Sequence, residues 1–211
     1  MTRIQDVQHS LFRSANPHYH RTDMIRHWAG AATDSRVAAC QVEQAVEYTL
    51  DRLAQSGSCL HLLDLSGYSL TTLPPFSIMR QLEGVTILDL RDNHLPGREL
   101  EKLSALTSLK QLYLSGNPLG EVSPDALNSQ SHISILEMAG CQLRTFPTDI
   151  LDLSHLDTLD ISNNLIACLP NNLGFCLPCL ATLNVCQTEI RELPDSLQYL
   201  EALTVLREKV Q

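Results

Sequence analysis

The chain has 211 residues, a formal net charge of −9 and 44% hydrophobic residues, which predicts one soluble domain. The negative charge argues against electrostatic binding of nucleic acid or of an anionic membrane. The apolar runs are only a few residues long, too short to cross a bilayer, and the start of the chain lacks the pattern of a secretory signal. Seven cysteines without a disulfide spacing pattern predict free thiols in a reducing compartment.

The N-terminal part divides into a tail and a helical segment. Residues 1–21 show weak periodicity and one acidic residue, so we expect a flexible tail. The sequence pattern of residues 22–57 predicts helices. Thr22 and Asp23 can cap a short first helix that ends near Ala32, because side-chain oxygens there accept hydrogen bonds from the free N–H groups of the first turn.

A longer second helix follows, with Thr33 or Asp34 as its cap and an end near Gln55. Its apolar residues recur at helical spacing on one face, while its acidic residues point elsewhere. We expect this face to cover the open end of the repeats that follow and so to act as an N-terminal cap. The apolar face consists of Ala39, Val42, Val46, Leu50 and Leu53.

Residues 58–211 repeat one pattern, apolar-x-x-Leu-x-apolar, followed by a turn position and a further apolar residue. Successive copies are separated by 23 to 25 residues, and a fixed period of this length indicates a solenoid. The alternating apolar positions are those of a short strand, so stacking predicts a parallel sheet with strands about 4.8 Å apart. The copies begin at Leu60, Val85, Leu109, Ile133, Leu156, Leu180 and Leu203.

The turn position of each copy carries a side chain that suits a bend closed off from water. An asparagine amide there can donate to and accept from the backbone of neighbouring copies. Asparagine with small cysteine and threonine substitutes predicts a hydrogen-bonded ladder, whereas Tyr68 does not fit and predicts an irregular first copy. The turn positions are Tyr68, Asn93, Asn117, Cys141, Asn164 and Thr188.

With these copies in phase, residues 58–211 resemble the leucine-rich repeat family. The length of each copy is similar to that of repeats in the typical or plant-like class of the family. The resemblance implies an α/β solenoid, a curved parallel sheet of about six to seven repeats. The segment 22–57 would be its N-terminal α-helical cap. A protein of this kind is expected to bind a protein partner and not to act as an enzyme.

Two columns of side chains are expected on the exposed, concave face of the sheet, one mainly acidic and one apolar in its first half. Carboxylates about 5 Å apart would repel by roughly 1 kcal/mol in water, so a protein partner with a basic surface would relieve that cost. Exposed aliphatic and aromatic residues beside charge are typical of a protein interface. The predicted partner-binding residues are Leu62, Asp64, Ile87, Asp89, Tyr113, Ile135, Glu137, Asp160 and Asn184.

The same columns also fit a plainer hypothesis. Leu-Asp-Leu is a frequent solvent-facing sequence in such repeats, and its acid can serve only to keep the concave face wet and soluble. The sequence leaves both hypotheses open. What favours an interface is that the acids stand beside Leu62, Ile87, Ile135 and Tyr113.

Catalytic and metal-binding patterns are weak. Cys176-x-x-Cys179 could form a redox pair or half of a zinc site, but a second ligand pair is not suitably placed and Cys176 falls at an inward position of its copy. His18 and His20 could ligate a metal only in an ordered tail. None of the cysteines has a His or Asp spaced to activate it. We expect no catalytic residue, no metal and no cofactor, and slow thiol labelling led by Cys186.

The N-terminal arrangement resembles a more specific group. A helical segment with Trp28, placed before a first copy that ends in Leu-Thr-Thr-Leu-Pro-Pro, is similar to the secreted bacterial leucine-rich repeat effectors that a type III system delivers into host cells. Residues 1–21 would suit a secretion tail. The resemblance implies a virulence effector in the host cytoplasm without a classical signal peptide. Many such effectors carry a ubiquitin-ligase domain, some with a Cys-x-Asp motif, and no cysteine here has Asp two residues later.

Two alternatives remain open for function. The chain could instead be an intracellular, cytoplasmic regulatory scaffold, or the substrate-recognition part of a ubiquitin ligase whose catalytic domain is absent here. At the C-terminal end, Arg207, Glu208 and Lys209 are expected to discourage edge-to-edge strand pairing. The solenoid then either stops on this charged edge or continues in a longer protein, and we expect a monomer.

Overall fold

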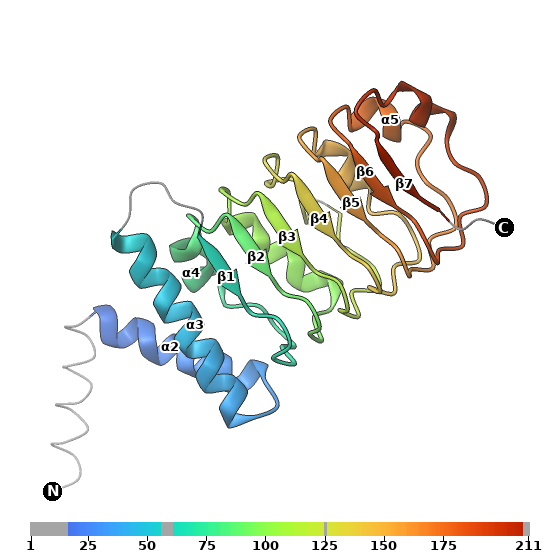
Figure 1. Ribbon diagram of the computed structural model, residues 1–211. Helices are drawn as coiled ribbons and strands as arrows, with labels where there is room; N and C mark the ends of the chain where they lie inside the picture. The colour runs from blue at the N-terminus through green and yellow to red at the C-terminus, as the bar shows by residue number, and fades with distance from the viewer. Residues whose placement is uncertain (1–16, 56–60, 125, 209–211) are drawn as a thin grey trace, which may run out of the picture.

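Across residues 17–55, 61–124 and 126–208, which the computed structural model describes, seven short strands form one open parallel sheet in sequence order. The sheet curves along an elongated molecule, with helices packed at its first strand and the last strand at the other end (Figure 1). This architecture confirms the predicted solenoid. The strands are β1 (Leu62–Asp64), β2 (Ile87–Asp89), β3 (Gln111–Tyr113), β4 (Ile135–Glu137), β5 (Thr158–Asp160), β6 (Thr182–Asn184) and β7 (Val205–Arg207).

The N-terminal helices are α2 (Pro17–Ala32) and α3 (Arg36–Gln55). Because α2 begins at Pro17, residues 17–21 are helical, whereas we expected them in the tail; residues 1–16 lie outside the described residues. Ser35 caps α3, since its Oγ accepts a hydrogen bond of 3.1 Å from the N–H of Ala38. The predicted caps Thr33 and Asp34 are therefore wrong by one or two positions. Among the described helices, none has the length and hydropathy that crossing a bilayer requires.

The predicted apolar face of α3 packs against the first repeat. Val42 and Val46 are fully buried, and Leu50 is 4% exposed. Helix α2 contributes a second contact, because the indole N–H of Trp28 donates to the carbonyl of Thr72 over 3.3 Å. The two helices thus cover the start of the core as predicted.

Short helical segments return the chain along the convex side of the sheet (Figure 1). Prolines in extended conformation stand directly before four of them, where the fixed φ of proline suits the entry into a helix. A proline therefore marks where these four segments begin. The segments are α4 (Phe76–Met79), η1 (Arg80–Leu82), η2 (Gly97–Ala105), η3 (Thr148–Asp152), α5 (Leu173–Cys176) and η4 (Asp195–Tyr199).

Asparagines at the turn positions form the predicted ladder. The Asn164 carbonyl accepts hydrogen bonds of 3.0 Å from the N–H groups of Cys141 and Leu143, while its amide donates to Met138 and Ile161. Asn93 and Asn117 bond to their neighbouring repeats in the same manner and are 3% and 0% exposed. A side chain in this position replaces water for backbone groups that the bend would otherwise leave unsatisfied.

The first copy is irregular only in its turn. Tyr68 contributes its backbone N–H, which donates to Asn93 of the next copy over 3.1 Å. Ser69, directly after it, has a left-handed φ of 56°, and Gln142 after Cys141 has one of 59°. Both copies lack asparagine in the turn. The strand of the first copy pairs in regular register, with Leu63 opposite Leu88.

The last strand lies on an incomplete core. Leu206 occupies the inward position of β7, yet it is 38% exposed, whereas Leu183 at the same position of β6 is fully buried. Arg207 is exposed at the edge, as expected, and Lys209 lies outside the described residues.

Candidate functional site

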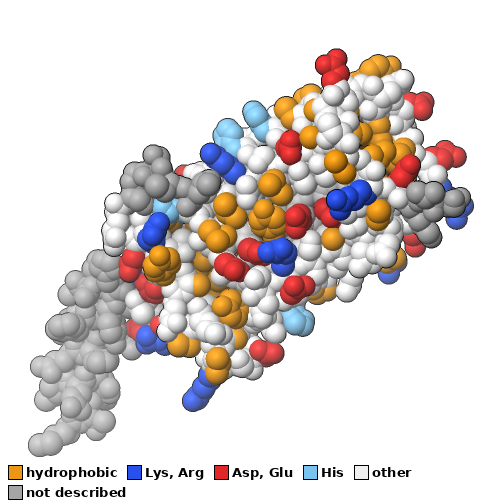
Figure 2. Space-filling view, viewed as in Figure 1, with side chains coloured by type: hydrophobic (Ala, Val, Ile, Leu, Met, Phe, Trp, Pro, Cys, Tyr) orange, Lys and Arg blue, Asp and Glu red, His pale blue; other side chains and the backbone are white. Residues whose placement is uncertain are grey.

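Strand register places the two predicted columns side by side on the concave face. Residues in the same position of successive strands are direct partners, so each column runs from β1 to β7. In Figure 2, hydrophobic, acidic and basic side chains are interspersed over this face. The first column contains Leu62, Ile87, Gln111, Ile135, Thr158, Thr182 and Val205. The second column contains Asp64, Asp89, Tyr113, Glu137, Asp160, Asn184 and Arg207.

The first column is most apolar over β1 to β4. Leu62 is 55% exposed, and Ile87 and Ile135 are half-buried. Over β5 and β6 the same position holds Thr158 and Thr182, which are also half-buried. An aliphatic side chain left in water costs about 25 cal/mol for each Å² of its exposed area. The N-terminal half of the concave face is therefore the part that gains most when a partner covers it.

Two acids of the second column are satisfied by neutral donors. Asp64 accepts hydrogen bonds from the backbone N–H and hydroxyl of Ser66, over 3.0 and 2.7 Å. Asp160 accepts from the backbone N–H and hydroxyl of Ser162, and its other oxygen accepts from the Asn184 amide over 2.8 Å. Asn184 thus holds a neighbouring acid in place.

A third acid of the second column, Asp89, is paired with a counterion from the same chain, which the sequence pattern did not predict. Asp89 is only 6% exposed, and Nε and Nη2 of Arg91 both donate to its carboxylate. This pairing raises the pKa of the Arg91 guanidinium above its usual range. The guanidinium also lies over the ring of Tyr113, with 5.2 Å between its carbon and the ring centroid. The expected repulsion along the whole column is therefore wrong at this position.

Glu137 differs from the other acids of the column. No side chain among the described residues donates a hydrogen bond to its carboxylate, although it is half-buried between Tyr113 and Asp160. Burial raises the pKa of Glu137; Arg91 lowers it, and Asp160 and Asp89 raise it further. The pKa of Tyr113 is also raised, first by burial and then by Glu137. Negative charge is thus least compensated at the middle of the sheet.

The residues two positions after the second column form a third column on the same face. Ser66, Arg91 and Ser162 belong to it, and they supply donors to the acids beside them. Strict alternation along each strand could have found this column, because a residue two positions further points to the same face.

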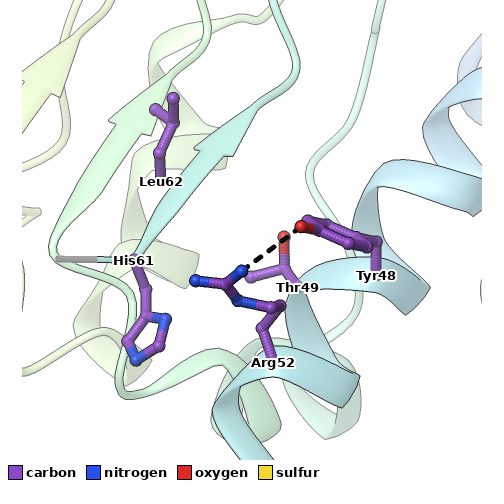
Figure 3. Close-up of a pocket in the computed structure, with 5 residues that line it drawn as sticks. All are labelled: Tyr48, Thr49, Arg52, His61 and Leu62. Atoms are coloured by element: carbon purple, nitrogen blue, oxygen red, sulfur yellow. Dashed lines mark hydrogen bonds between the residues drawn. The ribbon is translucent and has the colours of Figure 1, made fainter. Parts of the chain in front are cut away.

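A pocket of about 240 Å³ lies where the cap meets the sheet (Figure 3). Tyr48, Thr49 and Arg52 reach it from α3, and His61 and Leu62 reach it from the start of β1. Arg52 donates to the Tyr48 hydroxyl over 3.4 Å and lies over its ring. Because Leu62 belongs to both the pocket and the first column, the concave surface continues onto the cap.

The six cysteines among the described residues lie in three kinds of environment, and the structure changes the order of labelling expected for them. Cys186 is half-buried, whereas Cys40, Cys168 and Cys179 are exposed. Burial raises the pKa of the Cys141 thiol to about 11. We expect a thiol probe at neutral pH to modify the three exposed cysteines first and Cys141 last, because the thiolate is the reactive form. Mass spectrometry of a labelling time course checks this order, and early modification of Cys141 would contradict it.

Cys176 and Cys179, the candidate redox or zinc pair that the sequence analysis weighed against core packing, lie in different environments. Cys176 packs half-buried against the core, as its inward position predicts, while Cys179 is exposed. Among the described residues, no group of three His, Cys, Asp or Glu side chains is placed to hold a metal ion.

Comparison with known families and proteins agrees with the repeat pattern. The leucine-rich repeat model matches residues 58–119. Mouse Podocan is 33% identical over 110 residues, which cover 51% of this chain and 17% of Podocan. The chain thus spans about a sixth of that relative's length.

Solved structures show the same fold. Internalin C2 from Listeria monocytogenes superposes with a TM-score of 0.64 and 26% identity, over 78% of this chain and 73% of that chain. The Arabidopsis receptor kinase HAESA, solved with a peptide hormone and a co-receptor, superposes with a TM-score of 0.60 and 25% identity, over 70% of this chain and 25% of its own. Sequence pattern, sheet and solved structures together show that the chain has the leucine-rich repeat fold, and residues 58–119 match the model of that family.

Proposed function

We propose that the chain is a non-catalytic, monomeric protein-binding module that receives a protein partner with a basic surface on its concave face, without a cofactor. Leucine-rich repeat domains are in general binding scaffolds, and HAESA is seen with a peptide and a co-receptor. The observation that carries the proposal is that three aliphatic side chains of the first column lie beside the acids: Leu62 is exposed, and Ile87 and Ile135 are half-buried. Such a mixture is typical of protein interfaces.

Replacing two aliphatic residues of the column tests this proposal. In the double variant Ile87→Thr, Ile135→Thr, both strands receive the residue that Thr158 and Thr182 already place at the same position. The fold should therefore persist. We expect affinity for a protein partner selected with the wild-type chain to fall by roughly tenfold or more, because two anchoring contacts are lost.

The matched control is Val37→Thr, which removes an aliphatic side chain that is 70% exposed on α3, away from the sheet. Calorimetry with the purified partner measures both affinities, and circular dichroism confirms folding. Unchanged affinity of the double variant would place the interface on the convex side or on the cap.

The finer proposal is a bacterial effector that acts on a host protein after type III delivery. Its support is the sequence resemblance of the cap and first repeat to such effectors, with Trp28 anchored on the first repeat. The competing proposals are a eukaryotic-type regulatory scaffold and the recognition part of a ubiquitin ligase. A fusion of residues 1–30 to a reporter enzyme tests the effector proposal: translocation must depend on a working type III apparatus, and its absence would favour the scaffold.

A further inference from the structure

Glu137 is the position of the concave face that most needs a positive charge from outside. Its neighbours in the column already have partners: Asp89 is paired with Arg91, and Asp160 accepts from Ser162 and Asn184. Among the described residues, no comparable donor reaches Glu137. A half-buried carboxylate without a donor loses hydration without an equivalent hydrogen bond.

The surroundings of Glu137 leave room for a long side chain. The third column holds small residues next to it, Ser115, Ala139 and Ser162, and the N–H of Ala139 donates to the Ser115 hydroxyl oxygen over 3.0 Å. On the other side, Ile135 precedes Glu137 on the same face and offers an aliphatic wall. A long side chain from a partner would therefore lie over small residues on one side and against Ile135 on the other.

We propose that Glu137 accepts the guanidinium of an arginine from the protein partner, with Ile135 and Tyr113 packing against the arginine's aliphatic stem and Asp160 adding a second negative charge. The inference rests on the proposed function and specifies the chemistry of the partner. Arginine fits better than lysine because its guanidinium is weakly hydrated, carries five donors and packs on apolar and aromatic surfaces.

The electrostatics of the free protein agree with this assignment. Burial is the main cause of the raised pKa of Glu137, and Asp160 and Asp89 add to it. Arg91 lowers the pKa of Glu137, but its guanidinium is already paired with Asp89. Tyr113 on β3 also interacts with Glu137. A cation from a partner favours the charged form, so its binding must lower the pKa of Glu137.

The experiment uses hexa-arginine as the probe and the full chain at physiological ionic strength. We expect Glu137→Gln to weaken hexa-arginine binding by about fivefold or more, whereas Glu201→Gln, at an exposed acid outside the three columns and with the same change in net charge, weakens it by less than about twofold. In the wild-type chain, ¹³C-detected titration should show the pKa of Glu137 falling when the peptide is added. Hexa-lysine should bind more weakly.

Equal losses in the two variants would mean general attraction by a negative protein and would overturn the proposal. So would an unchanged pKa of Glu137, which is read from the wild-type chain and does not depend on how a variant folds. The outcome is separate from that of the proposed function: if Ile87→Thr, Ile135→Thr abolishes binding of the natural partner and Glu137→Gln does not, the concave interface stands and the arginine contact fails.

Discussion

Removing residues 1–57 is expected to make the remaining chain aggregate. Val42 and Val46 of α3 and Trp28 of α2 cover the first repeat, and their loss would expose its core leucines to water. A repeat stack without its terminal cap presents apolar surface and an open strand edge to other molecules. Light scattering after size-exclusion chromatography measures the effect. A truncated chain that stays monomeric and melts like the whole protein would show that the helices are not a cap.

A point substitution within the cap tests the effect of its packing on stability without shortening the chain. Val46→Asp places a carboxylate at a fully buried position of α3 and is expected to lower the free energy of unfolding by at least about 3 kcal/mol. Val37→Asp is the control, because Val37 lies on the same helix and is 70% exposed. Chemical denaturation should show little change for the control.

The second large effect is expected at the asparagine ladder. Asn164→Ala removes one carbonyl and one amide that together bond to Cys141, Leu143, Met138 and Ile161 inside the turn. Each buried backbone group left without a partner costs about 1–3 kcal/mol, so we expect a loss of roughly 3 kcal/mol or more. For a chain of this size, that lowers the melting temperature by roughly 6–12 °C.

Asn171→Ala is the control for this substitution. Asn171 is exposed in a turn near α5, so its replacement should change stability by less than about 0.5 kcal/mol. Differential scanning calorimetry compares both variants with the wild-type chain. Similar small shifts in both would show that water replaces the Asn164 amide without cost.

The difference in stability between Glu137→Gln and the wild-type chain should depend on pH in a defined direction. The folded-state pKa of Glu137 is raised, so the folded protein binds this proton more readily than the unfolded chain does. Its charged form therefore opposes folding above the folded pKa, and that opposition disappears as pH falls below the unfolded pKa. We expect Glu137→Gln to melt slightly higher than wild type near neutral pH and at the same temperature in acid.

The sequence by itself determined the solenoid, its register and its cap. A period of 23 to 25 residues with fixed apolar positions permits one stacking, because a slip of one residue would turn Leu88 or Leu159 from the core to water. The sequence also predicted the buried asparagines, since a polar residue that recurs at one inward position must form hydrogen bonds with the backbone groups there. The same spacing placed Ile87 and Glu137 in their columns.

Only the tertiary structure decided which charges of the concave face are already compensated. Leu-Asp followed by Leu or Ile gives Asp64, Asp89 and Asp160 nearly the same local sequence, yet Asp89 binds Arg91 while Asp160 takes the amide of Asn184 from the next repeat. The contact between Asp160 and Asn184 depends on side-chain reach across strands, which a one-dimensional pattern does not contain. The exposure of Leu206 at the last strand is of the same kind, because burial of an inward residue requires a neighbouring repeat and not only an apolar side chain.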